Sequence, residues 1–343
     1  MRLTLLLSLV LLWSCSLIAQ DALKLVSNVQ VIGIDIQSRY DFGRAICNER
    51  GTVLLPGGDH IKIASVIDSS GNVTQLARPE RFSDWQQWVT NAFAGSSAGF
   101  DVIVSGPSST PQANRPPQVE FHLLRYGSSG AFVSNRQLNI DFMPWNVAAF
   151  SSGRYLIEGV RTDKLKGPNK IDPVLAIVGA DGEVIRTIML PGDVAHPEQL
   201  HESPIRGTPE YAFHWSKLVS GDDGKVYLIR NSPTGPVYSV SDSGEVSQYV
   251  LQPPAEAPIF VAAGMREGKL AVVFVPERHL NGELAAIAQI LDAKTGTKFA
   301  QYRQIEGYTW GPVCVSPSSL TYLSTMGGTK TLTLTVLRPN TMN

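Results

Sequence analysis

One unit of four short apolar segments recurs six times along the chain, and this repeat constrains the fold more than any other feature of the sequence. Each unit opens with an aromatic residue, and short polar turns join its segments. Apolar segments of strand length separated by Asp-Gly and Ser-Gly turns are typical of β-hairpins. Such a repeat predicts an all-β fold, a six-bladed β-propeller. The opening aromatic residues are Phe42, Trp88, Trp145, Trp215, Phe260 and Trp310.

The third unit shows the pattern most completely. Its first two segments, Trp145–Phe150 and Tyr155–Val160, are separated by a Ser-Ser-Gly turn. Its last two, Val174–Val178 and Val184–Leu190, are separated by Ala-Asp-Gly. The predicted blades cover approximately residues 40–80, 85–140, 142–190, 211–252, 258–305 and 308–338.

The two ends of the chain predict how the ring closes. The sixth unit has three strands, because the chain ends soon after its third strand, Leu332–Leu337. An extra strand, Leu25–Ile34, precedes the first unit. We expect these two strands to pair, so that the N-terminal strand completes the last blade and covers an exposed sheet edge. Residues 20–343 would then form a single domain.

In this architecture the chain resembles the broad six-bladed β-propeller superfamily that includes the TolB-like and NHL-like proteins. The resemblance extends over residues 20–343 and is one of architecture. No motif in the sequence identifies a particular family within the superfamily, so it implies no functional residues.

The N-terminus indicates export. Residues 1–19 combine Arg2, a leucine-rich core and a small residue, Ala19, as in a signal peptide. Leu12-Trp13-Ser14-Cys15 also resembles a lipobox, which would anchor the protein through a lipid on Cys15. Both interpretations predict a periplasmic or extracellular protein without a transmembrane segment. With 29 basic and 30 acidic residues, the charge gives no reason to expect nucleic acid as a partner.

Connections of two lengths indicate which face of the propeller carries the function. The turns within the hairpins are short, whereas four connections on the opposite face are long. Binding residues concentrate on loops that a rigid scaffold holds, so we expect the ligand on the long-loop face. The long connections are Ser105–Gln118, Arg161–Asp172, Pro191–Tyr211 and Pro276–Glu283, and their candidate binding residues are Arg161, His196, His201, Arg278 and His279.

Aromatic residues at the same face have two interpretations. A set of tryptophans near the channel mouth could stack on a sugar or another flat ligand, and a histidine lies beside one of them. The same side chains could instead fill the wedges between neighbouring blades, which their repetition favours. The residues concerned are Trp88, Trp145, Trp215 and Trp310, with His214.

Metal binding is weakly indicated. His196 and His201 do not have the helical spacing of a zinc site, and Pro197 argues against a helix there, so a solvated loop is the better interpretation. Asn91 and Asn146 lie shortly after opening tryptophans and could contribute oxygen ligands to a divalent metal at the channel mouth.

The sequence predicts a binding protein more readily than an enzyme. No catalytic residue can be assigned, because no set of nucleophile, acid and base has a convincing spacing. The leading hypothesis is a non-catalytic binding or scaffold propeller whose ligand is a protein segment or a glycan. The alternative is a metal-dependent hydrolase or lactonase with its site at the channel mouth.

Two cysteines follow the leader, in the first strands of the first and last units. A disulfide between Cys47 and Cys314 would join neighbouring blades and is permitted outside the cytoplasm. A bridge requires Cα atoms within about 7 Å, and strands that border an open channel should lie farther apart. Small residues recur near this register, at Ala149 and Gly264. We therefore expect two buried free thiols.

Overall fold

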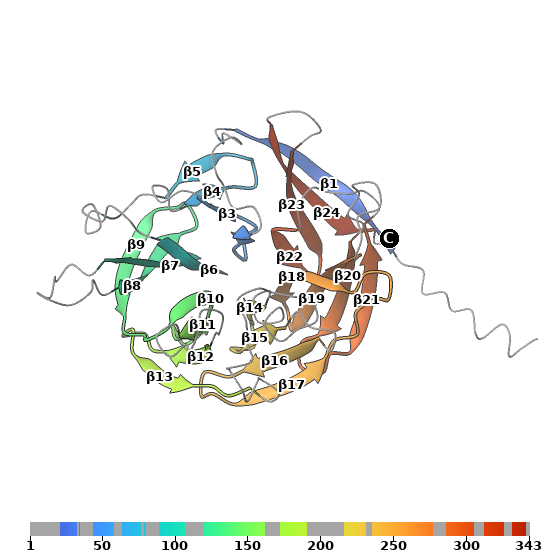
Figure 1. The fold of residues 1–343 in the computed structure, drawn as a ribbon. Coiled ribbons are helices and arrows are strands. Elements are labelled where there is room, and N and C mark those ends of the chain that lie inside the picture. Colours follow the sequence, from blue (N-terminus) through green and yellow to red (C-terminus); the bar gives the residue numbers. More distant parts are fainter. Residues whose placement is uncertain are drawn as a thin grey trace, which may run out of the picture.

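The strands are arranged as sheets around a ring (Figure 1). The computed structural model describes residues 21–32, 34, 44–57, 64–76, 79, 89–107, 119–161, 172–190, 216–230, 235–276, 286–304, 312–325 and 331–340. Within these ranges the strands form four sheets of four strands and one sheet of eight. The arrangement is that of a β-propeller, as the repeat predicts. No helix among the described residues is long and apolar enough to cross a lipid bilayer.

Each four-stranded sheet is an antiparallel meander whose strands follow one another in sequence, with the first strand innermost (Figure 1). The first sheet contains β2 (Ile46–Cys47), β3 (Val53–Pro56), β4 (Ala64–Ile67) and β5 (Val73–Gln75). The second contains β6 (Val89–Ser96), β7 (Gly99–Pro107), β8 (Val119–Gly127) and β9 (Phe132–Leu138). The third contains β10 (Met143–Ala149), β11 (Tyr155–Arg161), β12 (Asp172–Val178) and β13 (Val184–Thr187). The fourth contains β14 (Lys217–Ser220), β15 (Val226–Ile229), β16 (Pro236–Val240) and β17 (Val246–Val250).

The eight-stranded sheet consists of two runs of four strands, in the order β18-β19-β20-β21-β1-β24-β23-β22. A short parallel pairing of β1 with β21, Asp21 opposite Tyr302 and Ala22 opposite Arg303, joins the two runs. One run contains β18 (Ile259–Arg266), β19 (Lys269–Val275), β20 (Ile287–Asp292) and β21 (Lys298–Arg303). The other contains β22 (Cys314–Ser316), β23 (Ser319–Thr325), β24 (Leu332–Pro339) and β1 (Asp21–Val31).

The predicted pairing of the chain ends is confirmed. Strand β1 lies antiparallel to β24, with Leu25 opposite Leu337 and Val31 opposite Leu332. Strand β24 therefore has neighbours on both sides, β23 and β1. Because β1 satisfies the outer hydrogen-bonding groups of β24, the last strand of the chain is not an exposed edge.

Apolar side chains of neighbouring sheets form the core, and a single strand contributes to two interfaces. In β7, Val102 packs with Leu54 of the first sheet, whereas Ile103 packs with Ile157 of the third. The alternation of side chains along a strand produces this division. The side chains of Leu54, Val102 and Ile103 have no exposed surface, and each such burial contributes roughly 1.5–3 kcal/mol to stability.

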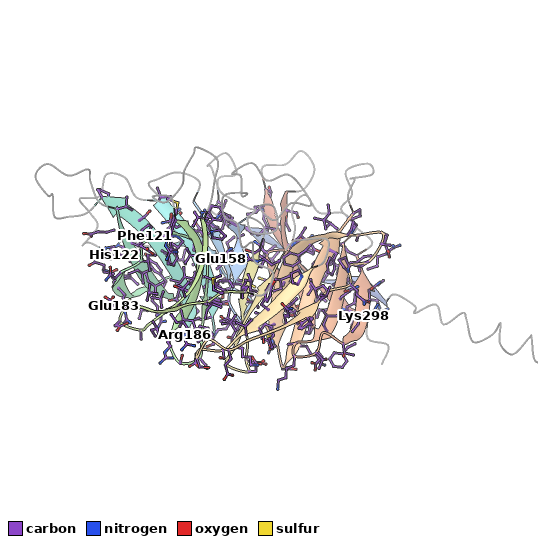
Figure 2. All side chains as sticks on the ribbon, turned by 60° about the horizontal axis from the view of Figure 1, so that its bottom comes forward. Phe121, His122, Glu158, Glu183, Arg186 and Lys298 are labelled. Atoms are coloured by element: carbon purple, nitrogen blue, oxygen red, sulfur yellow. The ribbon has the colours of Figure 1, made fainter. Side chains whose placement is uncertain are left out.

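The two ends of the ring differ in their connections. We call the turn end the one with the turns at residues 49–50, 97–98, 151–152, 222–223, 267–268 and 317–318, and the loop end the opposite one. In Figure 2, Glu183 and Arg186 lie toward the turn end, and His122 and Glu158 lie nearer the loop end. The connections of the loop end fall largely outside the described residues.

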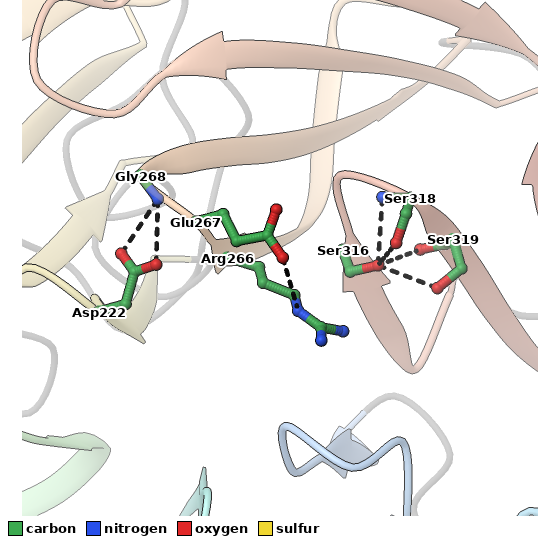
Figure 3. A network of polar contacts seen from close by, with 7 residues as sticks. All are labelled: Asp222, Arg266, Glu267, Gly268, Ser316, Ser318 and Ser319. Atoms are coloured by element: carbon green, nitrogen blue, oxygen red, sulfur yellow. Dashed lines mark hydrogen bonds and ion pairs between the residues drawn. The ribbon is translucent and has the colours of Figure 1, made fainter.

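At the turn end, one sheet stabilises the turn of the next (Figure 3). Glu267 and Gly268, between β18 and β19, have φ angles of +53° and +68°, as a two-residue hairpin turn of this hand requires. The Gly268 N–H donates to the carboxylate of Asp222, in the turn of the preceding sheet, at 3.1 and 3.0 Å. By fixing this turn, the contact helps to hold Glu267 in a left-handed backbone conformation, which residues other than glycine seldom adopt.

The innermost strands lie closer together than the sequence argument assumed. A Cβ atom on Gly95 of β6 would lie 2.1 Å from the carbonyl oxygen of Cys47, and one on Gly264 of β18 would lie 1.7 Å from that of Val315. Because glycine has no side chain, the backbones of neighbouring sheets can touch at these two positions. Cys47 and Cys314 are both free, as predicted. Cys314 is buried as expected, but the expectation of burial is wrong for Cys47, which is half-buried. The two cysteines share one apolar cluster, Cys314 within it and Cys47 packed against it.

Removing β1 should open the ring. A chain that begins after Tyr40 lacks β1 and leaves the outer edge of β24 unpaired, so we expect it to lose cooperative unfolding or to aggregate. Thermal and urea unfolding followed by circular dichroism measure this, with a chain that begins at Asp21 as the control. Unfolding of the shorter chain at the same temperature as the control would contradict the closure.

Candidate functional site

Three innermost strands contain a bulge near the loop end. The register skips one residue in β6, β10 and β18, and the skipped residues are Asn91, Trp145 and Val261. All three lie at the same sequence distance from the turn that follows their strand. A bulge locally increases the twist of a strand and redirects a side chain. The ring therefore redirects side chains at equivalent places on three sheets.

The bulges correct the register assumed for the opening aromatic residues. Phe260 lies one residue before the bulge of β18, whereas Trp145 is itself the bulged residue of β10, so the two are not equivalent. Phe260 is buried and contacts Phe274 edge to face, with ring centroids 6.5 Å apart. Trp145 is half-buried. Packing between strands thus explains the aromatic side chain of Phe260. The same explanation cannot be transferred to Trp145, which has a different position relative to its bulge.

Next to the bulged tryptophan lies a polar cluster of four residues, the half-buried Asn146 and the buried Glu158, Ser216 and Arg230. The amide nitrogen of Asn146 donates to Glu158 Oε2 at 2.8 Å and to Ser216 Oγ at 3.2 Å. The Ser216 hydroxyl donates to the same carboxylate oxygen, and the guanidinium of Arg230 pairs with Glu158 Oε1. Glu158 has no exposed surface, and Ser216 and Arg230 are 2% and 6% exposed.

The cluster spans the boundary between the third and fourth sheets. Asn146 and Glu158 lie opposite one another on β10 and β11, while Ser216 directly precedes β14 and Arg230 directly follows β15. Both of these strand ends are at the loop end. Along the same boundary, toward the turn end, the interface becomes apolar, with Leu156 and Leu228 in one core cluster.

Full pairing explains how two charges persist at this boundary. Moving a carboxylate and a guanidinium out of water costs several kcal/mol per ion, and only close pairing with further hydrogen bonds offsets that cost. Both oxygens of Glu158 have donors. The cluster is consequently rigid, because hydrogen bonds that cross from one sheet to the next hold its side chains.

Asn91 and Arg161 are also described by the structure, and each has partners outside this cluster. Asn91 donates to Ser105 Oγ at 2.9 Å and to the Val89 carbonyl at 3.2 Å. Arg161 forms an ion pair with Asp141 at 3.0 Å. Asn91 and Asn146 lie on different sheets, and their amide nitrogens donate to different partners. Within the described ranges, no group of three or more His, Cys, Asp or Glu residues is placed to hold a metal. The remaining candidates lie outside the described residues: Trp88, His196, His201, His214, Trp215, Arg278, His279 and Trp310.

Two more buried polar groups were missed by the sequence argument. Nearer the turn end, Arg125 donates to Asp101 at 3.0 Å and also contacts Tyr155. Burial raises the pKa of Asp101 above its ordinary value, and the Arg125 guanidinium opposes this shift without cancelling it. In β8, the buried His122 contacts Asn135 at 3.1 Å (Figure 2).

A common signal marks these missed residues. Glu158, Asp101 and His122 each have apolar residues directly before and on the far side in their strands: Ile157, Phe100 and Phe121 precede them, and Val160, Val102 and Leu123 follow. Ionisable residues are seldom fully buried unless they have partners, so an interruption of this kind indicates a buried partner. The partner itself is not evident from the sequence.

Comparison with known proteins finds likeness in structure alone. No family model matches the chain, and no curated protein matches it. A protein of unknown function from Dyadobacter fermentans has a TM-score of 0.54 at 11% identity, covering 93% of this chain and all of that one. The likeness is one of fold.

Two enzymes have lower similarity. Virginiamycin B lyase from Staphylococcus aureus has a TM-score of 0.45 at 10% identity, covering 92% of this chain and 99% of that one. A luciferin-regenerating enzyme has a TM-score of 0.48 at 13% identity, covering 92% of this chain and 96% of that one.

Removing one partner of the buried ion pair should destabilise the fold more than removing both. Arg230→Met leaves the Glu158 carboxylate buried without its cation, which we expect to cost about 3–5 kcal/mol of unfolding free energy. The double variant Glu158→Leu/Arg230→Met has no uncompensated charge and should cost less. Urea unfolding of Glu158→Leu, of Arg230→Met and of the double variant measures the coupling free energy between the two side chains. A loss below about 1 kcal/mol for Arg230→Met would contradict a buried pair.

Proposed function

We propose that this protein is an exported, non-catalytic binding propeller whose ligand lies at the loop end, over the boundary between the third and fourth sheets. The observation that carries the proposal is the paired cluster of Asn146, Glu158, Ser216 and Arg230 beside the half-buried Trp145. Loops positioned by a rigid scaffold commonly carry binding residues, and this cluster lies where β11 leads into a long connection.

The chemistry of this boundary suits a glycan better than a protein segment. Sugars present hydroxyl groups around a partly apolar ring, so they are bound by fixed polar groups together with an aromatic surface. Asn146 supplies a half-buried amide group and Trp145 an aromatic surface at a bulge, while the buried Ser216 holds the amide of Asn146 in place. The ion pair beneath them limits rearrangement, which reduces the entropy lost when a ligand binds.

Binding is favoured over catalysis by the state of Glu158. A general base needs a free lone pair directed at its substrate. Both oxygens of this carboxylate already accept bonds from protein donors. Glu158 therefore supports its neighbours and is poorly placed to react.

We further propose that the ring has six blades and that residues 1–19 direct export. The eight-stranded sheet divides naturally into two blades, because β1 and β21 are joined by only two parallel residue pairs, whereas β1 and β24 pair along most of their length. Removal of the signal peptide before Gln20, or lipidation of Cys15, would place the propeller in the periplasm or outside the cell.

The alternative function is that of a metal-dependent hydrolase or lactonase. Asn146 and Glu158 provide neighbouring side-chain oxygens of the kind that hard cations bind. However, Arg230 already pairs with Glu158, and a second cation at that carboxylate would be repelled by it. These residues therefore fit a neutral polar ligand better than a metal.

Glycan binding should depend on Trp145. We expect the mature protein to bind members of a glycan array, and Trp145→Ala to weaken binding at least tenfold, about 1.4 kcal/mol, with little change in melting temperature. Val261→Ala, at the equivalent bulge of β18, is the matched control and should bind normally.

Three outcomes would overturn the proposal. Equal binding by Trp145→Ala and the wild type would place the ligand elsewhere. Binding to peptides and to no glycan would mean that the ligand is a protein segment. A melting temperature that rises on addition of divalent metal, together with ester or lactone hydrolysis, would establish the alternative.

A further inference from the structure

The two cysteines meet where the first and last sheets of the ring adjoin. Cys47 belongs to β2, the innermost strand of the first sheet, and Cys314 to β22, at the end of the eight-stranded sheet. Cys314 is buried in an apolar cluster that draws on both sheets, and Cys47 packs against the same cluster. Two residues distant in sequence are thereby brought into one cluster at the boundary between the first sheet and the last.

The surroundings hold the two thiols together. An apolar cluster around them combines Val53 and Leu55 of the first sheet with Leu323 and Leu334 of the last. A Cβ on Gly95 would overlap the Cys47 carbonyl oxygen, so β6 restricts the backbone of β2 from the other side. Neither cysteine can move far from its partner without disturbing close-packed neighbours.

We propose that Cys47 and Cys314 form a disulfide bond when the protein meets a disulfide oxidant, and that this bond fastens the first sheet of the ring to the last. A disulfide requires an S–S distance of about 2.05 Å and Cα atoms within about 7 Å. The two cysteines lie on innermost strands of adjoining sheets and pack in one cluster, so a small approach of their sulfur atoms would reach that geometry. The proposal does not depend on what the propeller binds.

The reaction is an ordinary thiol–disulfide exchange. Cys47 is the more accessible of the two, so its thiolate attacks the oxidant disulfide, breaks the S–S bond and releases one thiolate. Cys314 then attacks the mixed disulfide, forms the Cys47–Cys314 bond and releases the second thiolate. The two protons lost by the cysteines are taken up by the two released thiolates. Two protein thiols are oxidised and one disulfide is reduced to two thiols.

Burial sets the order of these steps. Burial raises the pKa of Cys314 well above its ordinary range, and the neighbouring Cys47 adds to the shift. The thiol of Cys314 is therefore a poor first nucleophile. Once Cys47 carries the mixed disulfide, proximity to its sulfur compensates for the low thiolate fraction of Cys314.

The closed loop would include most of the chain, so the bond removes much freedom from the unfolded state. Strand β1 joins the chain ends at the outer rim of the ring, and the disulfide would join the same two regions at its inner side. Oxidation would thus make the closing boundary resistant to opening at both of its sides.

The test uses the wild-type protein treated with glutathione disulfide, with a dithiothreitol-treated sample as the control. Trypsin without reduction should release peptides 45–50 and 304–330 linked by a disulfide, and the link should be absent from the control. The oxidised protein should melt higher by on the order of 5–10 °C, and dithiothreitol should reverse the rise. Peptides that remain unlinked, with both cysteines open to alkylation, would overturn the proposal.

Two single variants separate the roles of the cysteines. Cys314→Ser should retain one glutathione on Cys47, because the second step cannot occur, whereas Cys47→Ser should remain unmodified while folded. Glutathione on Cys314 and none on Cys47 would contradict the proposed order. If Cys314→Ser fails to fold, the linked peptides of the wild type still decide whether the bond forms.

Discussion

The hydrogen bonds between β1 and β24 connect the two ends of the chain, and the ring depends on them. Each of the other sheets is a local meander, built from strands that are neighbours in sequence. The pairing of Leu25 with Leu337 is different, because it closes a loop of almost the whole chain. Forming such a contact costs much loop-closure entropy. The hydrogen bonds and burial that offset this cost form only when the remaining sheets are in place. Closure therefore makes the stability of every sheet conditional on its neighbours.

Contact between the innermost strands gives the ring its second constraint. Where Gly95 and Gly264 face neighbouring carbonyl groups, the strands approach until their backbones touch. Toward the loop end, the bulges at Asn91, Trp145 and Val261 interrupt this regular packing. Tight packing at one end and redirected side chains at the other explain why the paired cluster around Glu158 lies at the loop end.

Local features were predictable from the sequence, and contacts between sheets were not. Gly153 and Gly182 have φ angles of +83° and +93° in the turns that their Ser-Ser-Gly and Asp-Gly sequences predict, because turn chemistry is decided within a few residues. The strand at the N-terminus was predictable because the last unit lacked a fourth strand. Glu158 and Arg230, by contrast, are 72 residues apart, and neither is unusual without the other. The packing of Cys47 and Cys314 in one cluster was missed because it depends on how closely glycines allow the inner strands to approach.

Amide hydrogen exchange along β24 tests the closure of the ring most directly, because β24 is an interior strand only if β1 pairs with it. The account predicts that the amides of residues 332–338 are as strongly protected as those of β7, which has neighbours on both sides. Exchange in every second amide of β24 as fast as in β13, the outermost strand of its sheet, would contradict it, since the N-terminal strand would then not hold the ring closed.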